Sequence, residues 1–105
     1  MNRVTLFAMA LLVCAGPAAA HQLSVFARVE DGVVLIEAAF PDGRPVATGT
    51  LRILDATGAL IIEQPVTPPY PIRFAVGDHT DGLRIEVDAG GGHDNYWLLT
   101  PQDLN

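Results

Sequence analysis

The chain has 105 residues, six Lys or Arg, twelve Asp or Glu and one cysteine, and its formal net charge is −6. This length allows about one small domain and excludes a large active-site cleft between two domains. The acidic balance argues against a nucleic-acid binder, because neutralising phosphates requires clustered Lys and Arg.

The first twenty residues have the three parts of a secretory signal peptide. Arg3 supplies positive charge, Val4–Val13 is an apolar run, and Ala18 and Ala20 place small residues before a cut after Ala20. The apolar run would span only about 15 Å as a helix, about half of a bilayer core, so it is too short for a permanent anchor. We therefore predict a signal peptide at 1–20 and export to the periplasm.

Cleavage after Ala20 would leave one β-sandwich domain at 21–105, with His21 as its first residue. That domain has no cysteine and no lysine, and its formal net charge is −7. Its apolar runs are far shorter than a membrane helix, so we expect no transmembrane segment in the mature chain. Lipidation at Cys14 is a competing interpretation, although Val13 stands where lipoprotein processing needs a small residue.

Beyond residue 20 the apolar residues alternate with polar ones, and Gly, Pro, Asp and Asn form recurring turn signals. Seven strands are expected, at 22–30, 33–40, 51–54, 60–63, 72–76, 83–88 and 96–100. This pattern predicts an all-β fold, an immunoglobulin-like antiparallel β-sandwich of about seven strands. The missing Cys pair excludes a true antibody-type domain, and Trp97 is expected to fill the core from the last strand.

The number of strands also predicts which loops lie together. If successive strands alternate in direction, His21 shares one end of the sandwich with Asp42, the proline-rich loop 65–71 and the glycine-rich loop 90–95. His79 follows the fifth predicted strand and falls at the opposite end, where the Asp and Gly residues around it are ordinary turn formers.

An N-terminal histidine can chelate a metal ion through its α-amine and its imidazole Nδ1 together. The amine has a pKa near 8 and the imidazole near 6.5, so both lose their protons readily around neutral pH. Such nitrogen ligands suit Ni(II), Co(II), Cu(II) and Zn(II). His93 is the candidate third nitrogen, and Asp42 or Asp94 could add an oxygen ligand or orient His93. The alternative is that His93 is simply an exposed loop residue.

Catalysis is not indicated by the sequence, so we predict that the protein is not an enzyme. Ser24 is the only serine after residue 20, and it stands in the middle of a predicted strand. The carboxylates are scattered along strand faces without the pairing that acid–base chemistry uses. The three consecutive glycines at 90–92 do not lead into a helix, so they are not a phosphate-binding loop.

The order of several short motifs resembles a known protein family. These motifs are His21–Ala27 directly after the signal, Asp42–Val46, Val87–His93, Trp97–Leu99 and the ending Pro101–Leu104. Together they resemble small exported accessory proteins of bacterial nickel/cobalt uptake systems, which are energy-coupling-factor type ABC transporters. The glycine-rich stretch before His93, combined with an N-terminal histidine, is the more specific part of this resemblance.

The resemblance implies an extracytoplasmic protein that helps to deliver Ni(II) or Co(II) to the membrane subunits of the transporter. It points to His21 and His93 as the residues that bind the metal. The chain departs from the family pattern at Pro68–Pro71, where a Thr-Asp-x-x-Gly-x-Phe turn is usual, and it lacks the C-terminal membrane helix of many members. Contact with the transporter would then use protein surfaces, for which the stiff apolar loop around Tyr70 is a candidate.

Three hypotheses therefore stand. The first is a periplasmic metal-binding accessory of a nickel/cobalt importer, with Ni(II) or Co(II) as its cargo. The second is a periplasmic copper-binding β-sandwich that uses the same N-terminal histidine for Cu(II). The third is a structural β-sandwich module that binds no metal.

Overall fold

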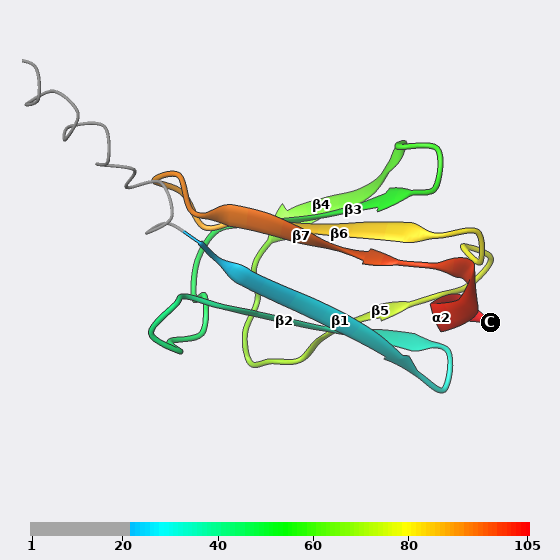
Figure 1. The fold of residues 1–105 in the computed structure, drawn as a ribbon, viewed down its shortest axis with the longest axis horizontal. Coiled ribbons are helices and arrows are strands. Elements are labelled where there is room, and N and C mark those ends of the chain that lie inside the picture. Colours follow the sequence, from blue (N-terminus) through cyan, green and yellow to red (C-terminus); the bar gives the residue numbers. More distant parts are fainter. Residues whose placement is uncertain (1–21) are drawn as a thin grey trace, which may run out of the picture.

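A computed structural model describes residues 22–105 of the chain (Figure 1). The predicted signal peptide at 1–20, with Cys14, and the candidate ligand His21 lie outside the described residues. The elements in chain order are β1 (Ser24–Glu30), β2 (Val33–Ala39), β3 (Thr50–Asp55), β4 (Leu60–Pro65), β5 (Ile72–Ala75), β6 (Leu83–Asp88), β7 (Asp94–Leu99) and the short helix α2 (Pro101–Leu104). All seven predicted strands are confirmed, with ends that differ by at most two residues.

The strands form two antiparallel sheets, one with the order β1-β2-β5 and the other with the order β4-β3-β6-β7. The all-β, immunoglobulin-like sandwich predicted from the sequence is therefore confirmed. Its fourth strand pairs with β3 in the larger sheet, whereas in a constant-type immunoglobulin domain the fourth strand joins the sheet of the first strand. This difference leaves β4 and β7 as the edges of the four-stranded sheet.

The core lies between the two sheets and comes from the alternation along each strand. In β6, for example, Leu83, Ile85 and Val87 are buried while Arg84 and Glu86 point outward. Among residues 22–105 no polar or charged residue is buried, so the interior is entirely apolar. Each such aliphatic side chain contributes about 1.5–3 kcal/mol when it is removed from water.

The hairpin between β1 and β2 shows how local sequence chooses a turn. Asp31 and Gly32 both have positive φ, 52° and 77°. Two residues of this kind match the right-handed twist of the flanking strands, which is why Asp-Gly is a preferred two-residue hairpin connection. The dipeptide therefore aligns β1 with β2 in the register that pairs Glu30 with Val33.

Two features at the end of the chain differ from the expectations. Trp97 is 38% exposed, so the prediction that it fills the core is wrong. It lies on the edge strand β7, and its ring packs edge-on against Phe26 of β1 at 5.0 Å between centroids. The helix α2, which strand periodicity did not indicate, begins with a capping box between Thr100 and Asp103. No helix in the described part of the chain is long and apolar enough to cross a membrane.

Candidate functional site

Three loops and the start of the described chain meet at one end of the sandwich, which we call the His93 pole (Figure 1). It comprises residues 22–23 and the loops 40–49, 66–71 and 89–93. The Asn95 side-chain amide donates a hydrogen bond to the Leu23 carbonyl oxygen at 2.6 Å, across 72 positions of sequence. The Tyr70 hydroxyl donates to the Val46 carbonyl oxygen at 2.7 Å and so joins the second and third regions of the pole.

The predicted grouping of loops is therefore confirmed from residue 22 onward. His79 lies at the other end of the molecule, where its ring stacks on Phe74 with centroids 6.2 Å apart. It lines a surface hollow there with Asp55 and Asp78. His79 and His93 thus belong to opposite ends, as the strand count predicted.

His93 closes the glycine-rich hairpin between β6 and β7. Its carbonyl oxygen accepts a hydrogen bond from the Ala89 N–H at 2.8 Å, and its own N–H donates to the Gly90 carbonyl oxygen at 3.0 Å. Gly90, Gly91 and Gly92 have φ values of 86°, 61° and 84°. Three consecutive residues in this region would strain side chains with a Cβ, so the glycines make this tight turn accessible.

Two described residues, Gly90 and Phe40, contact the His93 imidazole. Its Nδ1 lies 3.3 Å from the Gly90 carbonyl oxygen, and its ring packs edge-on against Phe40 at 5.5 Å. When Nδ1 carries the proton it donates to that carbonyl, and Nε2 then carries the lone pair. Metal-binding histidines are commonly oriented in this way, by a backbone carbonyl that accepts from the other ring nitrogen.

Asp42 shares the pole with His93 but is engaged by Arg44. The Arg44 side chain donates to one Asp42 carboxylate oxygen at 2.7 Å, and the Arg44 backbone N–H donates to the other at 2.9 Å. The side-chain hydrogen bond from Arg44 is the main reason that the pKa of Asp42 is lowered. The Arg44 guanidinium also lies over the Phe40 ring, 4.6 Å from its centroid. Asp42 is therefore tied to the loop that supports His93, and Arg44 would compete with a metal for its carboxylate.

Asp94 is placed differently from its neighbour His93. It opens β7 directly opposite Asp88 of β6, and it lines a hollow on the outer face of the four-stranded sheet with Glu86 and Tyr96. Successive side chains on a strand point to opposite faces. His93 precedes β7 and its ring contacts Phe40, whereas Asp94 lines the outer hollow.

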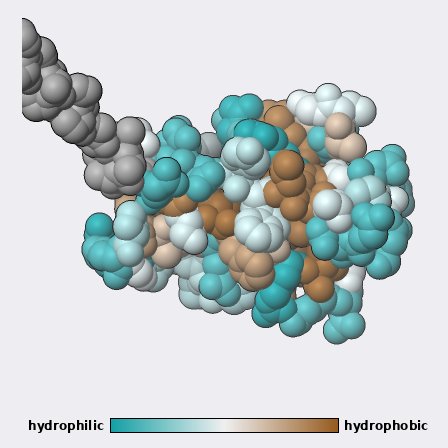
Figure 2. Space-filling model, in the orientation of Figure 1, coloured by the Kyte–Doolittle hydropathy of each residue, from teal (hydrophilic) through white to brown (hydrophobic). Residues whose placement is uncertain are grey.

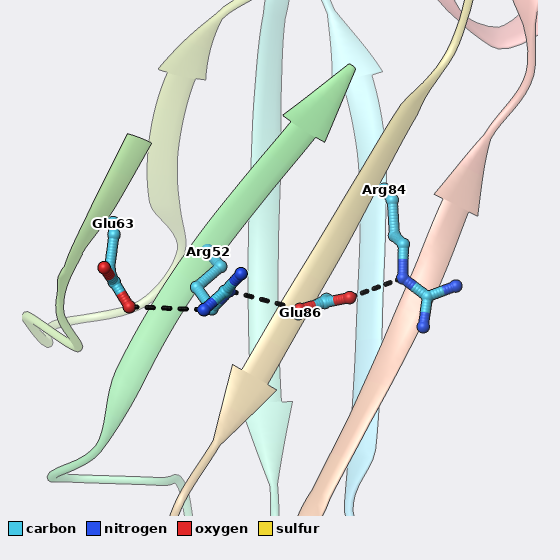
Figure 3. Close-up of polar contacts among 4 residues, drawn as sticks. All are labelled: Arg52, Glu63, Arg84 and Glu86. Atoms are coloured by element: carbon cyan, nitrogen blue, oxygen red, sulfur yellow. Dashed lines mark hydrogen bonds and ion pairs between the residues drawn. The ribbon is translucent and has the colours of Figure 1, made fainter. Parts of the chain in front are cut away.

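A ladder of charged side chains, which was not predicted from the sequence, crosses the outer face of the four-stranded sheet (Figure 3). Glu63 pairs with Arg52 at 3.4 Å, Arg52 with Glu86 at 3.4 Å, and Glu86 with Arg84 at 2.5 Å. The Arg84 guanidinium then covers the Tyr96 ring at 3.7 Å from its centroid. The bond to Glu86 is the main reason that the pKa of Arg84 is raised.

The charge alternation along β6 was visible in the sequence, but its partners were not. The ladder forms because Arg52 lies opposite both Glu63 on β4 and Glu86 on β6. Exposed ion pairs of this kind contribute about 0–1 kcal/mol each. We therefore read the ladder as a solvated surface and not as a reaction centre.

Within residues 22–105 no group of three or more His, Cys, Asp or Glu side chains is arranged to hold a metal ion. The ligand set predicted from the sequence includes His21, which precedes the described residues. Comparisons with protein-family models, with curated proteins and with solved structures find no match to this chain.

Proposed function

We propose that this protein is an exported, non-enzymatic accessory that binds Ni(II) or Co(II) as cargo and assists its uptake by an energy-coupling-factor type ABC transporter. The α-amine and Nδ1 of His21 would form a chelate, and Nε2 of His93 would supply a third nitrogen. These ligands match the preference of late first-row divalent metals for nitrogen. The partners would be the membrane subunits of the nickel/cobalt transporter.

The proposal rests mainly on the hydrogen bond from Asn95 to Leu23. Leu23 follows His21 by two positions, and two residues of extended chain reach about 7 Å. The bond thus anchors the chain just after the first ligand to the strand that follows the second ligand. The bond therefore supports a shared site, although His21 and His93 lie far apart in the sequence.

The orientation of His93 gives further support. Contact between its Nδ1 and the Gly90 carbonyl favours the tautomer in which Nε2 can coordinate a metal. The Phe40 ring limits rotation of the imidazole from one side. A ligand that is already oriented loses less entropy when it binds.

Calorimetry on the exported protein tests the proposal. The intact mass first establishes that His21 is the N-terminal residue, and the protein is then titrated with Ni(II), Co(II), Cu(II) and Zn(II). We expect binding of Ni(II) or Co(II) that is lost in His21→Ala and strongly weakened in His93→Ala. His79→Ala is the matched control, since it removes a histidine at the opposite end of the sandwich and should leave the affinity unchanged.

A variant that keeps a methionine before His21 separates the amine from the imidazole. This variant retains both histidine rings but moves the free amine by one residue, so it should bind Ni(II) more weakly. An unchanged affinity would contradict the role given to the amine.

The two alternative functions give different results. Binding of Cu(II) without Ni(II) or Co(II) would favour the copper-binding β-sandwich, whereas a mere preference for Cu(II) follows from the general affinity order and decides nothing. No binding of any of these metals by protein with a verified His21 terminus would favour the structural module. Co-purification of the protein with the membrane subunits then tests its place in the transporter.

A further inference from the structure

Exposed apolar side chains gather along one edge of the sandwich. Of the five large hydrophobic residues that are exposed in residues 22–105, four lie on β1 and β7, and the fifth is Leu60 on β4. The four are Phe26, Tyr96, Trp97 and Leu98, which we call the β7 edge patch. In Figure 2 an apolar band crosses the face on which β7 and β1 lie. Exposed apolar residues that gather on neighbouring positions mark an interaction site more often than scattered ones do.

β7 pairs only with β6 among the described strands, so no strand covers its other edge. The first backbone hydrogen bond of the β6–β7 hairpin runs from the Ala89 N–H to the His93 carbonyl oxygen. Hydrogen-bonded and non-hydrogen-bonded pairs alternate along antiparallel strands, so Trp97 and Leu99 form backbone hydrogen bonds with β6. Residue 98 then directs its N–H and carbonyl outward. The N–H groups of Tyr96 and Thr100 also point away from β6, because they donate to the side chains of Asn95 and Asp103.

This edge has little of the protection that sheet edges usually carry. Edge strands are commonly shielded by charges, prolines or bulges that prevent pairing with another strand. β4, the other edge of the same sheet, contains Glu63 and Pro65 and has a register shift against β3. β7 has a single charged residue, Asp94, at its first position. The middle of β7 therefore combines the outward N–H and carbonyl of Leu98 with apolar side chains on both faces.

The charges around the patch indicate the chemistry of its partner. Asp88 and Asp94 stand at the start of β7, and Asp103 lines the hollow that contains Phe26 and Trp97. The nearby arginines Arg28 and Arg84 are already paired, with Glu30 and Glu86. The rim is thus acidic at both ends of the strand.

A second copy of the chain fits this surface poorly. Two β7 strands in antiparallel pairing would bring Asp94 of one copy toward Asp103 of the other, and each domain from residue 21 onward has a formal net charge of −7. A partner with Lys or Arg beyond both ends of an apolar strand would instead place opposite charges together.

We propose that the β7 edge patch binds an extended segment of another protein, which adds as a fifth strand beside β7. The segment would have apolar side chains at alternate positions and a basic residue near each end. Its backbone would pair with Leu98, and its side chains would cover Tyr96, Leu98 and the Trp97–Phe26 contact. This mode of recognition takes affinity from main-chain hydrogen bonds and specificity from alternate side chains. The proposal is independent of metal binding at the His93 pole.

The probe is a capped synthetic peptide of about eight residues, a typical strand length, with alternating valine and threonine and a lysine at each end. Trp97 is the only tryptophan of the chain, so its fluorescence reports on the patch directly. We expect a saturable blue shift with the peptide, and slower hydrogen exchange at the Leu98 amide in the bound state. Both measurements use the unaltered protein.

Two controls sharpen the test. Leu98→Arg should weaken binding of the lysine peptide by about tenfold or more, since it removes a buried contact and adds a repelling charge. Leu60→Arg makes the same change at the exposed residue on the opposite edge, and it should leave the affinity unchanged. A peptide with glutamate in place of both lysines should bind at least about tenfold more weakly at low salt.

Three results would overturn the proposal. They are the absence of any fluorescence change with the lysine peptide, equal binding of the glutamate peptide, and a bound state without protection of the Leu98 amide. Self-association through the patch, seen as a concentration-dependent mass in sedimentation that Leu98→Arg abolishes, would assign the surface to a second copy instead.

Discussion

Asn95→Ala should loosen the link between the two halves of the candidate metal site. The change removes the hydrogen bond from the side-chain amide to the Leu23 carbonyl, at 2.6 Å, and the one from the Tyr96 N–H to the side-chain oxygen, at 2.9 Å. Each such bond contributes about 1 kcal/mol net, so the free energy of unfolding should fall by about 1–2 kcal/mol. In a domain of this size the Tm falls by about 4–8 °C for each kcal/mol.

The same variant should bind Ni(II) about fivefold more weakly. The bond to Leu23 contributes about 1 kcal/mol to holding the start of β1 against β7, and without it metal binding must supply that ordering. Urea denaturation followed by Trp97 fluorescence measures the stability, and calorimetry under native conditions measures the affinity. Both measurements are needed, because partial unfolding and weaker binding must be told apart. Partial unfolding lowers the apparent number of metal ions bound per protein, whereas weaker binding raises the Kd.

Asn105→Ala is the matched control for this prediction. Asn105 also donates from its side-chain amide to carbonyl oxygens, those of Pro101 at 2.7 Å and Thr80 at 3.2 Å, but at the end opposite the His93 pole. It should lower the stability slightly and leave the Ni(II) affinity unchanged. If Asn95→Ala lowers the Tm while its Ni(II) affinity equals that of the unaltered protein, the anchoring argument is refuted.

Three further predictions concern the fold that carries the site. Trp97→Ala should lower the free energy of unfolding by about 2–4 kcal/mol, because most of the ring is covered although 38% of it is exposed, and Ile85→Ala at a fully buried position should lower it by about 2–5 kcal/mol. Circular dichroism follows both urea transitions, since Trp97→Ala removes the only tryptophan of the chain. Gly49→Ala should destabilise by about 2 kcal/mol or more, since a Cβ at its φ of 143° would lie 2.4 Å from a carbonyl oxygen of β6; a Tm within about 2 °C of the original would contradict this. The pKa of Asp55 is lowered, chiefly by the hydrogen bond from the Thr57 side chain. The stability that Asp55 contributes is therefore complete above its ordinary pKa and is lost as the pH falls through its lower pKa in the folded protein. Urea midpoints measured from about pH 7 to about pH 2 should therefore drop at the acid end, and less steeply in Asp55→Asn.

Local sequence was sufficient for the strands and for the grouping of their loops. Period-two alternation and turn residues such as Asp31-Gly32 depend on interactions within a few positions, so they can be read without knowing the fold. Once seven strands that alternate in direction are established, the start of β1 must lie at the same end of the sandwich as the loops after β2, β4 and β6. The contacts of Leu23 with Asn95 and of Phe40 with His93 confirm this grouping.

The candidate ligands show how far this reasoning extends. The sequence singled out Asp42 and Asp94 beside His93 because all three follow from the same grouping of loops. The structure assigns Asp42 to Arg44 and directs Asp94 to the outer face of the larger sheet. Orientation within a pole depends on individual side-chain partners, which the strand count does not contain.

The sequence by itself determined which residues form strands, which face of each strand is apolar, and which loops share an end. Only the tertiary structure decided that β4 joins β3, that β7 is an edge, and therefore that Trp97 is exposed beside Phe26. Alternation assigns Trp97 to the same face as the buried Leu99, and this is where the sequence prediction failed. The physical reason is that periodicity reports the face of a strand but not its neighbours, and burial requires a neighbour.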